Sequence, residues 1–263
     1  MKAFFTLALT SLAVWLAAPA MAETAAEKGL RIAKSVEAGE SGFNDHAADG
    51  EMILATAGGN TATRRFDTRT VDTGPGSSRS LLIFRWPGDI DKTTLLTHSY
   101  DGKTDDQWLY LPAVGQVRRI SSSARSGSFV GSEFAYEDMA DQDVDAFTYM
   151  WINDEGCPGE GDTCHVVDRR PKERSGYSVQ RVWVDTADTR IRRIAYFDRR
   201  GAHLKTLDVM GYRQYQGQYW RPNRMVMTNH LTGKRTTLTW TNHRFNVGAN
   251  PNEFTTNALR RIR

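Results

Sequence analysis

Apolar and polar residues alternate with a period of two in parts of the second half of the chain, where strand-like runs are separated by turns. Ile191, Ala195 and Phe197 fall on one face of one such run, and Leu238 and Trp240 fall on one face of the last. A period of two is typical of a half-buried β-strand. Because short polar turns join the runs, we expect an antiparallel meander. The predicted strands of this half cover residues 177–185, 190–198, 202–212, 219–229 and 235–245.

The first half of the chain shows the same rhythm after one amphipathic segment. Thr24 and Glu27 have the spacing of a capping box, and apolar residues then recur at helical spacing, which predicts a helix over about 25–38. A short second helix is predicted over 132–142. The predicted strands of this half cover residues 51–56, 61–73, 79–86, 92–100, 105–111, 116–120, 146–154 and 165–170.

This balance of elements determines the predicted fold class, because few helices must cover many strands. We predict a mainly β (α+β) domain in which an incomplete, strongly curved antiparallel β-barrel carries one to three helices on its concave face.

The first 22 residues have the three regions of an export signal. Lys2 is followed by an apolar stretch over 4–18, and Ala20 and Ala22 provide a small-residue cleavage site. We expect cleavage after Ala22 and export of a single domain covering 23–263. Because no Cys follows the site, no lipid anchor is expected there.

The two cysteines, Cys157 and Cys164, bracket a turn rich in Gly between two predicted strands. In an oxidising compartment this spacing predicts a disulfide that closes a hairpin loop. Two Cys without paired His do not predict a zinc site.

Composition and motifs exclude several classes of function. The net charge is +3, with Lys and Arg scattered among Asp and Glu, so no nucleic-acid-binding surface is indicated. The chain lacks a zinc-hydrolase motif, a nucleophile elbow and a phosphate-binding loop. Asp141, Asp143 and Asp145 imitate the start of a calcium loop, but Ala146 and Ile152 stand where Gly and a bidentate Glu are required. We expect no metal, no cofactor and no enzymatic activity.

Aromatic residues stand in and around a polar segment rich in Ser and Gly, at 121–132. Exposed rings are unfavourable in water, so these rings must be covered by the protein core or by an apolar ligand. Each ring taken singly is typical of core packing. As a group, with Met residues that adapt to flexible chains, they indicate a lipid-binding cavity with the segment 121–132 as a movable lip. The candidate ligand-binding residues are Trp86, Trp108, Tyr110, Arg125, Phe129, Phe134, Tyr136, Trp151, Met225 and Met227.

The export signal, the first helix and above all the segment from Trp108 to Met139 resemble the LolA-like family of outer-membrane lipoprotein-sorting proteins. Within that family they are most similar to the periplasmic branch associated with RND/MMPL-type transporters. The resemblance implies an unclosed barrel around an apolar cavity and a periplasmic carrier of lipid or acylated lipoprotein. It also implies an inner-membrane transporter as partner, and a monomer is favoured.

Two features leave alternatives open. The family's cavity arginine has three candidates here, Arg64, Arg65 and Arg125. A second function is an envelope signalling or scaffold module that uses the same barrel to sense lipid or to dock a membrane protein.

Overall fold

The computed structural model describes residues 22–141 and 143–262. The predicted signal peptide falls almost wholly on residues 1–21, outside the described residues. Within the described chain one α-helix, α1 (Ala25–Glu40), precedes all the strands. It begins with the predicted capping box, in which the Thr24 hydroxyl accepts from Glu27 N and the Glu27 carboxylate accepts from Thr24 N.

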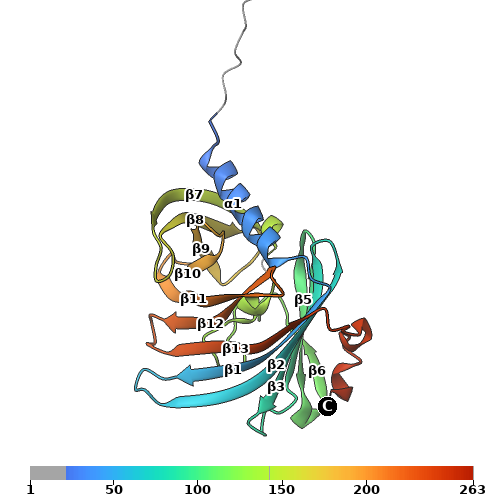
Figure 1. Ribbon diagram of the computed structural model, residues 1–263. Coiled ribbons are helices and arrows are strands. Elements are labelled where there is room, and N and C mark those ends of the chain that lie inside the picture. The colour runs from blue at the N-terminus through green and yellow to red at the C-terminus, as the bar shows by residue number, and fades with distance from the viewer. Residues whose placement is uncertain (1–21, 142, 263) are drawn as a thin grey trace, which may run out of the picture.

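The strands of the described residues form one antiparallel sheet of 13 strands, with the order β6-β5-β4-β3-β2-β1-β13-β12-β11-β10-β9-β8-β7. The ends β6 and β7 do not pair, so the barrel is unclosed, and the predicted fold class is confirmed (Figure 1). The strands are β1 (Asp45–Ala55), β2 (Thr61–Gly74), β3 (Ser77–Trp86), β4 (Thr94–Tyr100), β5 (Lys103–Leu111), β6 (Gln116–Arg119), β7 (Phe147–Gly156), β8 (Thr163–Pro171), β9 (Tyr177–Asp185), β10 (Ile191–Asp198), β11 (His203–Tyr215), β12 (Tyr219–Asn229) and β13 (Arg235–Phe245).

The strand β1 begins six residues before the strand predicted at Glu51. Its first part has small residues and little apolar alternation, and one of these, Gly50, is required by packing. A Cβ atom at Gly50 would lie 2.2 Å from the ring of Phe66 on β2, so only Gly lets that buried ring lie over the backbone.

The prediction of a short helix over 132–142 is wrong. Its described part contains a single 3₁₀ turn, at Tyr136–Met139. Val130 and Gly131 have positive φ angles, and Ser128 forms a β-bridge with Ala135, so the chain there makes a tight turn that a helix cannot follow. None of the helices in the described part of the chain is long and apolar enough to cross a membrane.

Strand β3 is buried on both faces of the sheet. Leu82 and Phe84 pack in the main core on the concave face, whereas Leu81 and Ile83 pack in a second core beneath Phe254. This second core lies on the convex face, where the C-terminal segment with its 3₁₀ turns at Pro251–Glu253 and Leu259–Arg261 covers the sheet (Figure 1). Burial on both faces explains the unbroken apolar run of β3.

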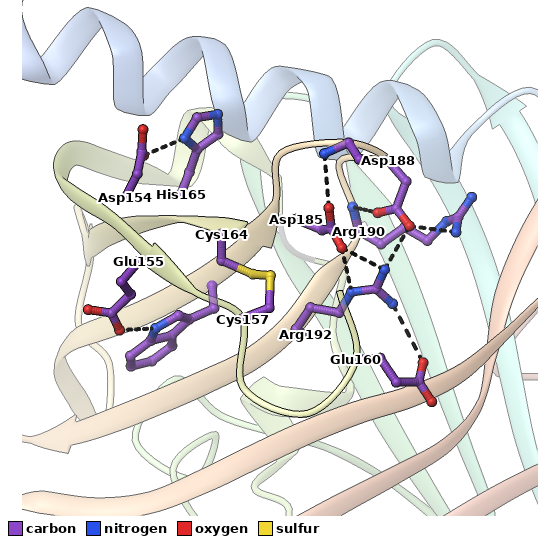
Figure 2. The surroundings of a disulfide bond; sticks show 12 residues. Asp154, Glu155, Cys157, Glu160, Cys164, His165, Asp185, Asp188, Arg190 and Arg192 are labelled. Atoms are coloured by element: carbon purple, nitrogen blue, oxygen red, sulfur yellow. Dashed lines mark hydrogen bonds and ion pairs between the residues drawn. A yellow bond between two sulfur atoms is a disulfide. The ribbon is translucent and has the colours of Figure 1, made fainter. Parts of the chain in front are cut away.

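The predicted disulfide between Cys157 and Cys164 is present, with an S–S distance of 2.03 Å. It closes the turn between β7 and β8 (Figure 2). Glu160 in this turn lies 3.7 Å from the guanidinium of Arg192, which also donates to Asp185 at 2.8 Å. The turn is thereby attached to β9 and β10 as well as to its own strands.

Candidate functional site

A cavity of about 530 Å³ lies between α1 and the concave face of the sheet. Alternate residues of each strand point to the same face, and on the strands β8 to β11 the residues that face the cavity are mainly aliphatic. This volume is within the usual range for small-molecule sites. The aliphatic lining includes Ile32, Ala33 and Val36 of α1, Val144, Val167 of β8, Val182 and Val184 of β9, Ile191 and Ile194 of β10, Leu207 and Val209 of β11, and Pro222 and Met225 of β12. The aromatic side chains of Phe43, Tyr149, Tyr212 and Trp220 also line the cavity.

The helix covers this hollow without filling it. Gly29 rests on the backbone of β7, where a Cβ atom would lie 2.9 Å from Trp151 N. The later turns of α1 then present small and medium side chains, Ala33 and Val36, to the cavity. The space between these side chains and the floor remains open.

Two arginines and a glutamate form a polar wall at the C-terminal end of α1. Arg221 of β12 donates from Nη2 to the carbonyl oxygen of Glu40 at 2.9 Å and from Nη1 to Trp220 O at 2.7 Å. It thus satisfies a terminal carbonyl of a helix that has no basic residue in its last turn. Arg169 of β8 is buried and donates to Gln180 at 2.8 Å.

Burial governs the ionisation of this wall. Desolvation lowers the pKa of Arg169 and of Arg221. The arrangement supplies strong donors at one side of the aliphatic floor.

The opposite wall carries carboxylates from the turn that follows β4, from β5 and from the segment that precedes β7. Asp105 is buried and accepts from Ser99 Oγ at 2.9 Å and from Asp141 N at 3.0 Å. Burial, and next the nearby Asp141, raise the pKa of Asp105 to about 7. Asp101 and Asp143 also line this wall.

Two of the three residues compared above with a calcium loop, Asp143 and Asp145, form an acidic cluster here with Asp101, and Asp141 is not a member of it. Carboxylate oxygens of Asp101, Asp143 and Asp145 are within 4.8 Å of one another. The two Asp143 oxygens accept from Gly102 N at 2.6 Å and Asp145 N at 2.8 Å, which accounts for the position of Asp143 as a link between two loops.

The other end of the concave face is filled by the segment 121–139. Phe129 and Phe134 of this segment are fully buried, and the Phe129 ring stacks on Phe84 of β3 with a centroid distance of 5.8 Å. Residues 121–139 are absent from the described lining of the cavity. From Phe129 onward the segment therefore packs as part of the core, whereas residues 121–128 of the predicted lip are largely exposed and lie outside the cavity lining.

A buried ion pair fastens this segment to the sheet. Lys205 Nζ of β11 lies 2.6 Å from Asp138 Oδ2, with exposed side-chain fractions of 5% and 2%. Asp138 also accepts from Tyr177 Oη at 2.8 Å and Ala135 N at 2.7 Å, and Lys205 donates to Glu133 O at 2.9 Å. The charges are thus paired and hydrogen-bonded, as burial requires.

The structure distributes the predicted ligand-binding residues over three environments. Among the described residues of the cavity lining, Met225 is the one member of the predicted set. Met227, Phe129, Phe134 and Tyr136 belong to the core of the filled end.

The remaining predicted residues lie outside the cavity lining. Trp108 and Tyr110 face the second core on the convex side, beneath the C-terminal segment. Trp151 lies under the Lys28 ammonium, 3.6 Å from its ring centroid. Trp86 is half exposed at the end of β3, and Arg125 is half-buried in the filling segment.

Of the three candidate cavity arginines, none is in the described lining, which instead contains Arg169 and Arg221. Nothing in the local sequence marks these two, because they reach the cavity through strand pairing. The aliphatic alternation of Val182 with Val184 and Leu207 with Val209 was the available signal for the floor.

Comparisons with known proteins agree with this geometry. A crystal structure of a putative outer membrane lipoprotein-sorting protein domain from Vibrio parahaemolyticus is 41% identical, covers 89% of this chain and 99% of its own, and has a TM-score of 0.85. A DUF1329 family protein from Desulfovibrio piger is 30% identical, covers 90% and 99% of the two chains, and has a TM-score of 0.84. A LolA superfamily protein from Nitrosomonas europaea, 17% identical with 87% and 98% coverage and a TM-score of 0.69, shares the fold.

These matches define the class as LolA-like. A family model described as an uncharacterized protein matches residues 76–261, and no curated protein matches. The chain belongs to the DUF1329 family of LolA-like proteins.

Proposed function

We propose that the protein is a non-enzymatic periplasmic carrier that shields a lipid or an acylated lipoprotein in the cavity beneath α1. The observation that carries the proposal is the aliphatic hollow of about 530 Å³, which the side chains of α1 leave open. Burial of an acyl chain contributes about 0.8 kcal/mol per CH₂, so such a hollow favours a flexible apolar chain.

The relatives support the same reading. The Vibrio parahaemolyticus structure is described as a lipoprotein-sorting domain, and it spans nearly the whole of this fold. We propose that a domain covering 23–263 is exported and cleaved after Ala22, without lipidation, and acts as a monomer. An RND/MMPL-type transporter of the inner membrane is the proposed partner, on the basis of the resemblance in 108–139.

The proposal is tested by filling the cavity from its helix side. Ala33→Trp places an indole among the lining residues, whereas Ala38→Trp adds the same ring to an exposed position of the same helix. Protein purified without detergent is titrated with a fluorescent fatty acyl probe and is examined by native mass spectrometry for bound lipid.

We expect wild type and Ala38→Trp to bind the probe alike and Ala33→Trp to bind it at least tenfold more weakly, with all three folded by circular dichroism. Equal binding by all three proteins, or no lipid and no probe uptake by wild type, would overturn the carrier proposal.

A further inference from the structure

Six hairpin turns lie at the end of the sheet that is remote from the cavity walls. Because neighbouring strands are antiparallel and sequential, alternate turns meet at the same end of the sheet. We call these turns together the tip rim. They comprise residues 56–60, 87–93, 112–115, 172–176, 199–202 and 230–234.

Contacts join neighbouring turns of the tip rim at two places. Arg199 Nε donates to Ser175 O at 2.8 Å, which joins two of them. A Cβ atom at Gly233 would lie 3.1 Å from Ala57 Cβ, so the β12–β13 and β1–β2 turns touch. These two turns project side by side in Figure 1, away from the end of α1 that covers the cavity.

The tip rim carries half of the large apolar side chains that are exposed among the described residues. Six large apolar side chains of the described residues are exposed, and three of these lie on or beside the rim: Trp86 (49%), Val114 (58%) and Leu231 (67%). The Arg65 guanidinium lies 5.9 Å from the centroid of the Trp86 ring. An aromatic ring beside a cation is typical of a membrane–water interface.

The charges of the two ends of the sheet are opposite in sign. The turns of the tip rim contain three acidic residues, Asp89, Asp91 and Glu173, and six exposed basic ones, Lys92, Lys172, Arg174, Arg199, Arg200 and Lys234. The turns at the other end, 75–76, 101–102, 157–162, 186–190 and 216–218, contain one basic residue, Arg190, and four acidic ones, Asp101, Glu160, Asp162 and Asp188.

We propose that the tip rim docks the protein on an anionic lipid surface. Its exposed cations are attracted to anionic head groups, while Trp86, Val114 and Leu231 enter the interfacial region. The acidic end is repelled by the same surface, so the attraction also sets the orientation. Because Gly76 and Asp101 of the acidic end line the cavity, the docked protein presents its cavity away from this membrane.

The test uses flotation of the full mature protein with vesicles of phosphatidylcholine alone and of phosphatidylcholine with phosphatidylglycerol. The variants are Trp86→Ser/Val114→Ser/Leu231→Ser and Arg199→Glu/Arg200→Glu. The matched control is Met150→Ser/Ile152→Ser/Val247→Ser, which removes the other three exposed apolar side chains. Thermal unfolding verifies that each variant is folded.

We expect wild type and the control to float with anionic vesicles at low salt and to be released at 0.5 M salt, since exposed charges are then screened. Both rim variants should partition more than about tenfold less. Three results would each overturn the proposal: equal binding to neutral and anionic vesicles, rim variants that float like wild type, or a wild type that binds another protein through the tip rim but does not bind vesicles. None of these outcomes depends on whether the cavity holds a lipid.

Discussion

Two methionines on one strand show how differently the two ends of the concave face are built. Met227 of β12 is fully buried, in the core that the segment 121–139 completes. Met225, two residues earlier on the same strand, borders the open cavity. The same residue type is thus core at one end and lining at the other, and the difference comes from what lies opposite.

At the filled end the opposing side chains are aromatic and are fastened by a buried charge pair. At the hollow end they are the small and medium residues of α1, whose approach to the sheet is determined by Gly29 on β7. The comparison leads us to expect that the filled end contributes mainly to stability and that the hollow end takes the proposed cargo. Substitutions at the filled end should affect folding, and those at the hollow end should affect cargo.

The largest effect should come from Asp138→Asn, which leaves the Lys205 ammonium buried without its carboxylate. Breaking a buried pair in this way costs about 3–5 kcal/mol. Urea unfolding gives the free energy of unfolding, and the matched control is Asp106→Asn, whose partner Arg119 is exposed, with an expected loss below about 1 kcal/mol. Similar losses for the two variants would mean that the segment is not fastened by this pair.

The two methionines themselves give the next prediction. Met227→Ala creates a void in a packed core and should destabilise by about 2–5 kcal/mol. Met225→Ala enlarges an existing hollow, so its cost should be about 1 kcal/mol or less, while acyl-probe affinity changes for this variant alone. Equal losses of stability would show that the hollow is closed in solution and would remove the contrast between the ends.

The sequence predicts the fold of this protein better than it predicts the residues of the candidate site. Alternation over the strands and the capping box at Thr24 define local structure, and the elements they predict are present. The predicted disulfide is also present, because its two Cys flank a single turn. Curvature followed from the ratio of strands to helices.

The site depended on pairings between distant residues. Phe129 and Phe134 were expected to be covered by the core or by a ligand. The sheet itself covers them, and the ion pair between Asp138 and Lys205 holds their segment against it. Trp108 and Tyr110 lie on the convex face of the sheet, where the C-terminal segment covers them. Sequence patterns identify which residues are buried. They do not show on which face of a curved sheet those residues are buried.

Removal of the disulfide tests how much the β7–β8 turn contributes to stability and to probe binding. Cys157→Ser/Cys164→Ser opens a short loop and should lower the free energy of unfolding by about 2–3 kcal/mol. Because the turn is attached through Glu160 and Arg192 to β9 and β10, which wall the cavity, probe binding should weaken as well. Reduced wild type should behave like the variant; a reduced protein with unchanged stability and binding would show that the loop contributes to neither.

The smallest predicted effect concerns Asp105 in the cavity wall. Its pKa in the folded protein is about 7, against an ordinary value of 3.8, and Asp141 and Arg125 are the charged groups that act on it. Between these two values the folded protein keeps a proton that the unfolded chain has released, so this carboxyl makes stability fall as pH rises through 7. From pH 5.5 to pH 7 the free energy of unfolding of wild type should fall by about 1–2 kcal/mol relative to Asp105→Asn, in which an amide oxygen can still accept from Ser99 and from Asp141 N.

His46 and His243, whose pKa values burial lowers to about 3 and about 4, are common to both proteins and cancel in this difference. Parallel pH profiles would show that Asp105 is solvated, and hence that the carboxylate wall of the cavity is as open to water as the outer surface.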